Sequence, residues 1–155
     1  LVDPQKVAIR GGSAGGYSVM AALSKSNLFA AGASYYGISD LEVLTQGTHK
    51  FESRYLDQLI GPYPEARDIY MERSPIYNID KITAPLLLLQ GSEDKVVPPD
   101  QAEGICTKLK QKGVDVRYIS FEGEGHGFRQ LQNQMLALET ELSFYREALK
   151  LGCSR

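Results

Sequence analysis

At 155 residues, the chain is long enough to bury a hydrophobic core and is about the length of one domain. Its composition is that of an ordinary globular protein, and a formal net charge of -2 argues against a nucleic-acid or anionic-membrane surface. Two cysteines are too few for a disulfide framework, and no apolar run could span a bilayer, so we expect a cytoplasmic protein in a reducing compartment.

The first part of the chain predicts two strands joined by a helix. Residues 7–10 form a short apolar segment after the Asp3-Pro4 turn signal, and residues 14–24 suit a helix rich in small residues. Residues 31–37 then predict a second buried strand. Continuous apolarity in both strands is typical of a sheet that is covered on both faces.

Residues 38–81 break this pattern, because they are polar and aromatic and are interrupted by Gly61-Pro62 and Ser74-Pro75. The segment is longer than a minimal crossover between two strands, and excess of this kind tends to build a site. We expect short helices within it, near residues 41–44, 51–60 and 65–73.

The second half of the chain predicts two more strands and two more helices. Residues 86–90 form the clearest strand, a helix begins near Asp100 and stops at Gly113, and residues 116–121 form the fourth strand. Repeated strand–helix units indicate an α/β fold with a parallel sheet and right-handed crossovers. The last helix carries an apolar stripe that we expect to face the core, made of Leu131, Met135, Leu138, Leu142, Tyr145 and Leu149.

The segment Gly11-Gly12-Ser13-Ala14-Gly15 has the pattern Gly-x-Ser-x-Gly between a predicted strand and a predicted helix. This is the context of a nucleophile elbow, where a serine sits on a sharp turn and its hydroxyl is exposed at the end of the strand. The N–H group of Ala14 would then lie at a helix N-terminus, where it can donate to a developing oxyanion. A small-residue turn without any chemistry is the alternative reading of the pattern.

Two further side chains follow predicted strands, Asp94 after residues 86–90 and His126 after residues 116–121. Because the carboxyl ends of parallel strands share one edge, we expect Ser13, Asp94 and His126 to meet there as a nucleophile, an orienting carboxylate and a base. Asp94 could instead cap its own turn, with Glu93 as a competing carboxylate, and His126 could be an exposed loop residue.

His49 is the only other histidine and is expected at the surface. The two histidines lie far apart in the sequence, and the chain has no paired cysteines. We therefore expect neither a metal site nor any other cofactor.

Three blocks of the sequence resemble the catalytic blocks of the prolyl oligopeptidase family, and above all its acylaminoacyl-peptidase and dipeptidyl-peptidase branches. They surround Ser13, Asp94 and His126 and span residues 11–17, 91–98 and 123–128. The resemblance implies a three-layer α/β-hydrolase fold with a mainly parallel sheet. It also implies a serine peptidase that cleaves short peptides, or acylated or dipeptidyl N-termini, through an acyl-enzyme intermediate.

The resemblance covers only the later part of the family's catalytic domain. The family's earlier strands, its N-terminal propeller and the loop that would supply a second oxyanion donor have no counterpart in residues 1–155. We therefore expect a single, partial catalytic domain, the carboxyl-terminal part of a larger peptidase. The strand at residues 7–10 would then form an open edge through which the chain associates with itself.

The long middle segment is expected to line a pocket for the residue that precedes the cut bond. Tyr36, Phe51 and Tyr55 are the candidates for an aromatic wall, although packing into the core would explain these residues equally well. Arg54 could bind a substrate carboxylate but is expected to pair with a neighbouring acid. Two other functions stay open, a carboxylesterase and a catalytically inert assembly domain.

Overall fold

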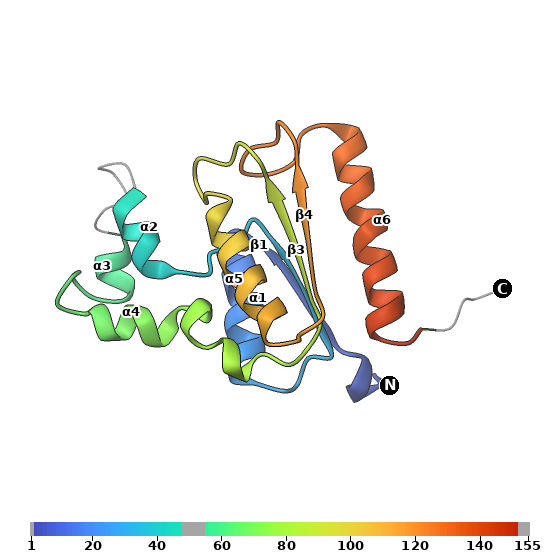
Figure 1. Ribbon diagram of the computed structural model, residues 1–155, viewed down its shortest axis with the longest axis horizontal. Coiled ribbons are helices and arrows are strands. Elements are labelled where there is room, and N and C mark those ends of the chain that lie inside the picture. The colour runs from blue at the N-terminus through green and yellow to red at the C-terminus, as the bar shows by residue number, and fades with distance from the viewer. Residues whose placement is uncertain (1, 48–54, 152–155) are drawn as a thin grey trace.

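The computed structural model describes residues 2–47 and 55–151. Its centre is a parallel sheet in the order β1-β2-β3-β4, so strands that follow one another in the sequence are also neighbours in space (Figure 1). The α/β fold with a parallel sheet that the sequence predicts is therefore confirmed. The four strands are β1 (Ala8–Gly12), β2 (Ala31–Tyr35), β3 (Leu86–Gly91) and β4 (Val116–Phe121).

Helices cover both faces of this sheet and complete a three-layer structure. Helices α1 (Ala14–Lys25) and α5 (Asp100–Gln111) lie on one face, and α6 (Leu131–Ala148) lies on the other (Figure 1). The leucines of β3 alternate between two hydrophobic clusters, because successive side chains of a strand point to opposite faces. Leu86 and Leu88 pack with α1 and α5, whereas Leu87 and Leu89 pack with α6.

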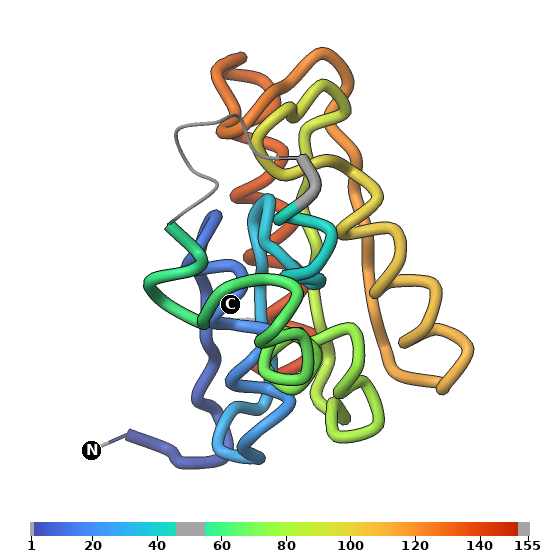
Figure 2. Tube along the Cα trace, turned by 90° about the vertical axis from the view of Figure 1, so that its left-hand side faces the viewer, coloured from blue at the N-terminus to red at the C-terminus, as the bar shows by residue number. Residues whose placement is uncertain are grey.

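Between β2 and β3 the chain forms a small helical insertion beside the sheet. It contains α2 (Leu41–Gly47), α3 (Tyr55–Leu59) and α4 (Arg67–Arg73), followed by two short 3₁₀ turns at Pro75–Tyr77 and Ile79–Lys81. Figure 2 views the molecule from this side, with the insertion in front of α1. The insertion has a small core of its own, made of Leu41, Leu56 and Tyr70.

The orientation of α6 differs from the prediction. Four residues of the expected core stripe, Leu131, Met135, Leu138 and Leu142, are between 52% and 71% exposed. Ala137, Glu141 and Phe144 face the sheet instead. The last two residues of the stripe do face the core as predicted, Leu149 as a buried member of the cluster and Tyr145 as a partly buried residue packed against it. The inward face thus includes a charged residue, Glu141.

Among the described residues, no helix combines the length and the apolar character needed to cross a membrane.

Candidate active site

Ser13 lies on the sharp turn between β1 and α1, and its backbone has φ 57° and ψ -119°. Few residues other than glycine adopt a positive φ, so this turn is strained. The strand and the helix also approach closely, because a Cβ on Gly11 would lie 2.5 Å from the carbonyl oxygen of Gly15. The turn is held in place by the N–H group of Ser13, which donates to the carbonyl oxygen of Tyr35 at 2.9 Å.

The structure brings the three predicted side chains together at the carboxyl edge of the sheet. The Nε2 atom of His126 lies 2.8 Å from the Oγ atom of Ser13, although the two residues are 113 positions apart in the sequence. The Nδ1 atom of His126 lies 2.8 Å from the Oδ2 atom of Asp94. The side chain of Asp94 is fully buried, and that of His126 is 23% exposed.

Asp94 follows β3 and makes the contacts expected of both readings of its position. Its Oδ1 atom accepts hydrogen bonds from the N–H groups of Val96 and Val97, both at 2.9 Å, and so caps its own turn. Its Oδ2 atom remains for His126. The competing carboxylate, Glu93, is exposed to solvent.

The loop that carries His126 is fixed by Glu124, which the sequence analysis did not single out. Its buried carboxylate accepts hydrogen bonds from the backbone N–H groups of Arg129 and Gln130 and from the side chain of Asn133. The hydrogen bond from Arg129, followed by that from Asn133, holds the pKa of Glu124 below its usual value. The sequence offered one indication of this role. A carboxylate between two glycines, Gly123 and Gly125, is available to hold a loop that the glycines leave flexible.

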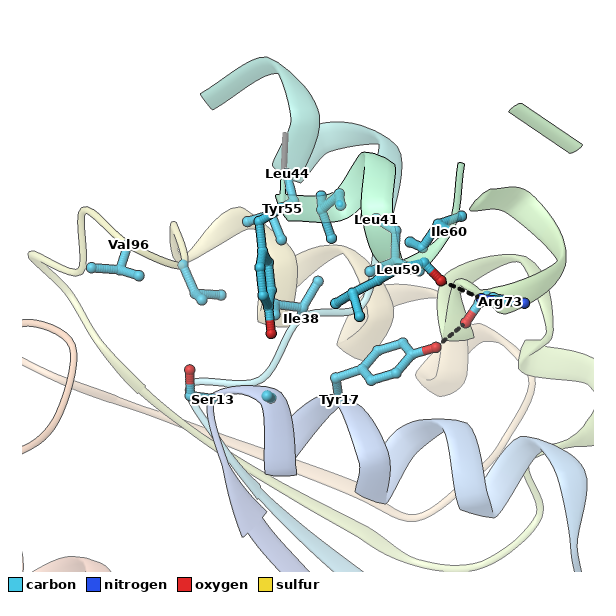
Figure 3. A pocket seen from close by; sticks show the side chains of 13 residues that line it. Ser13, Tyr17, Ile38, Leu41, Leu44, Tyr55, Leu59, Ile60, Arg73 and Val96 are labelled. Carbon is cyan, nitrogen blue, oxygen red and sulfur yellow. Dashed lines mark hydrogen bonds between the residues drawn. The ribbon is translucent and has the colours of Figure 1, made fainter. Parts of the chain in front are cut away.

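An apolar cavity of about 340 Å³ begins at Ser13 and extends between α1 and the helical insertion (Figure 3). The hydroxyl of Tyr17 donates to the carbonyl oxygen of Arg73, and Arg73 Nη1 donates to the carbonyl oxygen of Leu59, so this end of the wall is fixed. The other lining residues are Ala14, Ile38, Leu41, Leu44, Tyr55, Leu56, Ile60, Val96 and Val97.

Of the residues expected to line the pocket, the structure describes two, and they lie in different places. Tyr55 lies in the cavity wall. Tyr36 lies beside His126 instead, with its ring centroid 4.9 Å from that of the imidazole, and it also contacts the ring of Phe128. Phe51, together with His49 and Arg54, falls outside the described residues. Tyr17, which the sequence analysis left unassigned, lies one helical turn after Ser13 and therefore on the same side of α1.

Ala14 is the first residue of α1 and lies beside Ser13 in the cavity wall. In chemical terms, the site places an imidazole between a hydroxyl group and a buried carboxylate. This arrangement suits the removal of a proton from the hydroxyl and its return to a leaving group. The described residues contain no group of three or more side chains of the types that bind metals.

The family model described as "Prolyl oligopeptidase family" matches residues 1–152. Dipeptidyl aminopeptidase BIII of Pseudoxanthomonas mexicana is 34% identical over 139 residues, which make up 86% of this chain and 20% of that protein.

Many solved structures are similar in fold, and two of them show the extent of the likeness. A puromycin-hydrolyzing peptidase of Mycobacterium tuberculosis has a TM-score of 0.93 and is 48% identical, covering 96% of this chain and 23% of that one. An acylaminoacyl peptidase in complex with Z-Gly-Gly-Phe-chloromethyl ketone has a TM-score of 0.85 and is 30% identical, covering 94% and 24%. The chain thus spans about a fifth of the length of the curated relatives it matches. It belongs to the prolyl oligopeptidase family.

Proposed function

We propose that the protein containing this chain is a serine peptidase in which Ser13 is the nucleophile, His126 the base and Asp94 the residue that orients His126. The observation that supports this most strongly is the unbroken hydrogen-bond series from Ser13 through His126 to Asp94, at 2.8 Å for each step. Ser13, at one end of this series, also lines an apolar cavity that can hold a side chain of the substrate.

In the first half of the reaction, Oγ of Ser13 attacks the carbonyl carbon of the scissile amide while Nε2 of His126 accepts the hydroxyl proton. The negative charge that develops on the carbonyl oxygen is stabilised by the N–H group of Ala14 at the start of α1. His126 then donates the proton to the leaving amine, the C–N bond breaks, and the acyl group remains on Ser13. Asp94 stabilises the imidazolium throughout.

In the second half, His126 removes a proton from water, which attacks the acyl-enzyme. The proton passes to Oγ of Ser13 as the ester bond breaks, so the serine is regenerated and a carboxylic acid is released. The chemistry requires no group beyond the three side chains, an oxyanion donor and water.

The substrates we propose are short peptides, or acylated or dipeptidyl N-termini, with an apolar side chain on the residue whose carbonyl carbon is attacked. The cavity supports this, because it starts at Ser13 and most of its lining side chains are apolar. The phenylalanine-containing inhibitor of the related acylaminoacyl peptidase has the same character.

Labelling with a fluorophosphonate, read by intact mass, tests the proposal most directly, with the Ser13→Ala variant as the control. We expect one adduct on the wild-type protein and none on the variant. Hydrolysis of phenylalanyl and alanyl-phenylalanyl p-nitroanilides should fall by about 10⁴- to 10⁶-fold in Ser13→Ala.

Two outcomes would assign a different function. Turnover of p-nitrophenyl esters without turnover of any amide would indicate an esterase. Failure of Ser13 to react in the full-length protein would indicate an inert site.

A further inference from the structure

Gln90 has an unusual position for an amide side chain. It lies near the end of β3, directly after four buried leucines, and it is itself fully buried. The alternation along the strand places it on the same face as Leu86 and Leu88, where the neighbouring side chains are apolar. A buried amide in such surroundings is costly unless its polar atoms find partners.

The Nε2 group of Gln90 has such partners, and all of them are acceptors. It donates to the Oδ2 atom of Asp94 at 3.2 Å and to the carbonyl oxygen of Val97 at 3.0 Å, with the carbonyl oxygen of Gly91 at 3.4 Å. Because an amide oxygen cannot donate to these groups, their chemistry fixes which end of the amide faces them. The Oε1 atom of Gln90 has no hydrogen-bond partner among the described residues.

The oxygen of Asp94 that Gln90 contacts is the one that His126 uses. Oδ1 is already held by the N–H groups of Val96 and Val97, so the backbone of the turn fixes one half of the carboxylate. Gln90 and His126 both contact the other oxygen of the carboxylate, Oδ2. Through its bond to the carbonyl oxygen of Val97, Gln90 also connects this turn to the end of β3.

We propose that Gln90 is a positioning residue for the reaction: its amide N–H group holds the carboxylate of Asp94 in the orientation that accepts the Nδ1 proton of His126. The role rests on the proposed function, because it acts through Asp94 and His126 and makes no contact with a substrate. The last torsion of a carboxylate has broad minima, so the two N–H groups on Oδ1 restrict its rotation only in part, and a side-chain donor on Oδ2 restricts it further.

The test compares Gln90→Met with the wild type in the full-length protein. Methionine has nearly the same volume and shape but no N–H donor, so packing is retained. We expect kcat, and the rate at which a small fluorophosphonate labels Ser13, to fall by about 10- to 100-fold, the size of effect that follows a misplacement of about 1 Å. KM for an apolar p-nitroanilide should change less than twofold, since Gln90 does not line the cavity.

Two further variants address the donor itself. Gln90→Glu places an acceptor opposite three acceptors and should lower the labelling rate further than Gln90→Met does. Gln90→His returns an N–H group at a similar reach and should restore part of the lost rate. Rescue by histidine together with loss in methionine and glutamate would not be expected of a purely structural glutamine.

Gln101 provides the matched control, because it is equally buried and also makes hydrogen bonds, in its case with the backbone of Ser39 and Asp40. We expect Gln101→Met to lower Tm about as much as Gln90→Met while Ser13 is labelled at the wild-type rate. The proposal is overturned if Gln90→Met is labelled at the wild-type rate, or if both variants lose labelling equally. A wild-type protein that does not react would instead overturn the proposed function, and this role with it.

Discussion

The backbone of Ser13 carries strain that its own side chain does not relieve. Its φ of 57° lies in a region that costs non-glycine residues about 1–3 kcal/mol. The N–H group of Ser13 is bonded to the carbonyl oxygen of Tyr35, so the surrounding sheet holds the residue in this conformation. The hydroxyl of Ser13 thus occupies the end of the strand at the expense of stability.

Replacing Ser13 by glycine should therefore stabilise the chain. Glycine adopts a positive φ without a Cβ clash, whereas alanine keeps the strain, so we expect Ser13→Gly to be about 1 kcal/mol more stable than Ser13→Ala. Urea unfolding of the two variants measures the difference. Equal midpoints and slopes would show that the turn holds no such strain.

Gly91 controls the distance between the two loops that carry Asp94 and His126. A Cβ at this position would lie 2.4 Å from the carbonyl oxygens of Glu124 and Gly125, which are backbone atoms of the histidine loop. We expect Gly91→Ala to cost about 1–3 kcal/mol and to slow the labelling of Ser13 as well, because the loops must move apart. Urea unfolding and fluorophosphonate labelling measure the two effects.

The control for this substitution is Gly104→Ala in the middle of α5. The added Cβ there meets only the Cδ1 atom of Ile76, at 3.4 Å. Since alanine is a better helix former than glycine, this variant should gain about 0.5–1 kcal/mol and label normally. A Gly91→Ala protein that behaves like Gly104→Ala would contradict the close approach of the loops.

The predictability of the site differed from residue to residue. Ser13, Asp94 and His126 could be placed together because each follows a strand of one parallel sheet, and the ends of such strands share an edge. Gln90 and Glu124 could not, because their importance depends on hydrogen bonds across neighbouring turns. The periodicity of the sequence does not predict these contacts.

At the level of elements, a charged contact fastens α6 to the sheet. Arg10 of β1 donates two hydrogen bonds to the buried carboxylate of Glu141, at 2.8 and 3.1 Å, and the hydroxyl of Tyr35 in β2 donates a third at 2.6 Å. Burial alone would raise the pKa of Glu141, but the hydrogen bonds from Arg10 and Tyr35 outweigh it and the pKa is lowered.

This contact predicts a pH dependence of stability. Because the folded protein holds the pKa of Glu141 below its usual value, the stabilisation is present above the pKa of the unfolded chain and is lost as the pH falls through the lower, folded pKa. Glu141→Gln should cost about 1–3 kcal/mol at neutral pH. Its difference from the wild type in urea unfolding should shrink as the pH falls through the lowered pKa of Glu141, and a constant difference would show that ionisation of Glu141 contributes nothing.

The exposed stripe of α6 explains why the inward face of this helix was predicted wrongly. The stripe has the regular apolar spacing, yet the face that packs on β2 and β3 is built from Ala137, Glu141 and Phe144. A hydrophobicity pattern counts glutamate as an outward residue. The pattern does not show that Arg10, from a strand distant in the sequence, pairs with Glu141 and so allows the glutamate to be buried.

Two sets of substitutions in α6 check this orientation. Leu138 and Leu142 are 60% and 52% exposed, so replacing each by glutamine should change the free energy of unfolding by no more than about 0.5 kcal/mol. Phe144 is fully buried, and Phe144→Ala should cost about 3–5 kcal/mol. Urea unfolding of the three variants would contradict the orientation if the leucines proved the costlier residues.

At the scale of the whole molecule, we propose that the 155-residue chain on its own associates with itself. β1 is an edge strand of the described sheet, and exposed edges offer unpaired backbone groups to a second chain. Light scattering should show species larger than a monomer, growing with concentration, and a single monodisperse monomer would exclude association.

A double variant distinguishes association through the edge of β1 from association through the exposed leucines of α6. If Leu138→Lys with Leu142→Lys leaves the association unchanged, the edge of β1 carries it. If the double variant is monomeric, the apolar face of α6 carries it instead.

The distance in sequence between Ser13 and His126 has a consequence for the biosynthesis of the protein. During translation Ser13 is made 113 residues before His126, whose imidazole contacts its hydroxyl in the folded chain. At roughly 5–20 residues per second, a ribosome needs about 6–23 seconds to cover that interval. The β3 and β4 strands must then pair before the two side chains can meet. Until then the growing polypeptide holds Ser13 without its imidazole partner, and the contact between the two side chains forms only with the completed sheet.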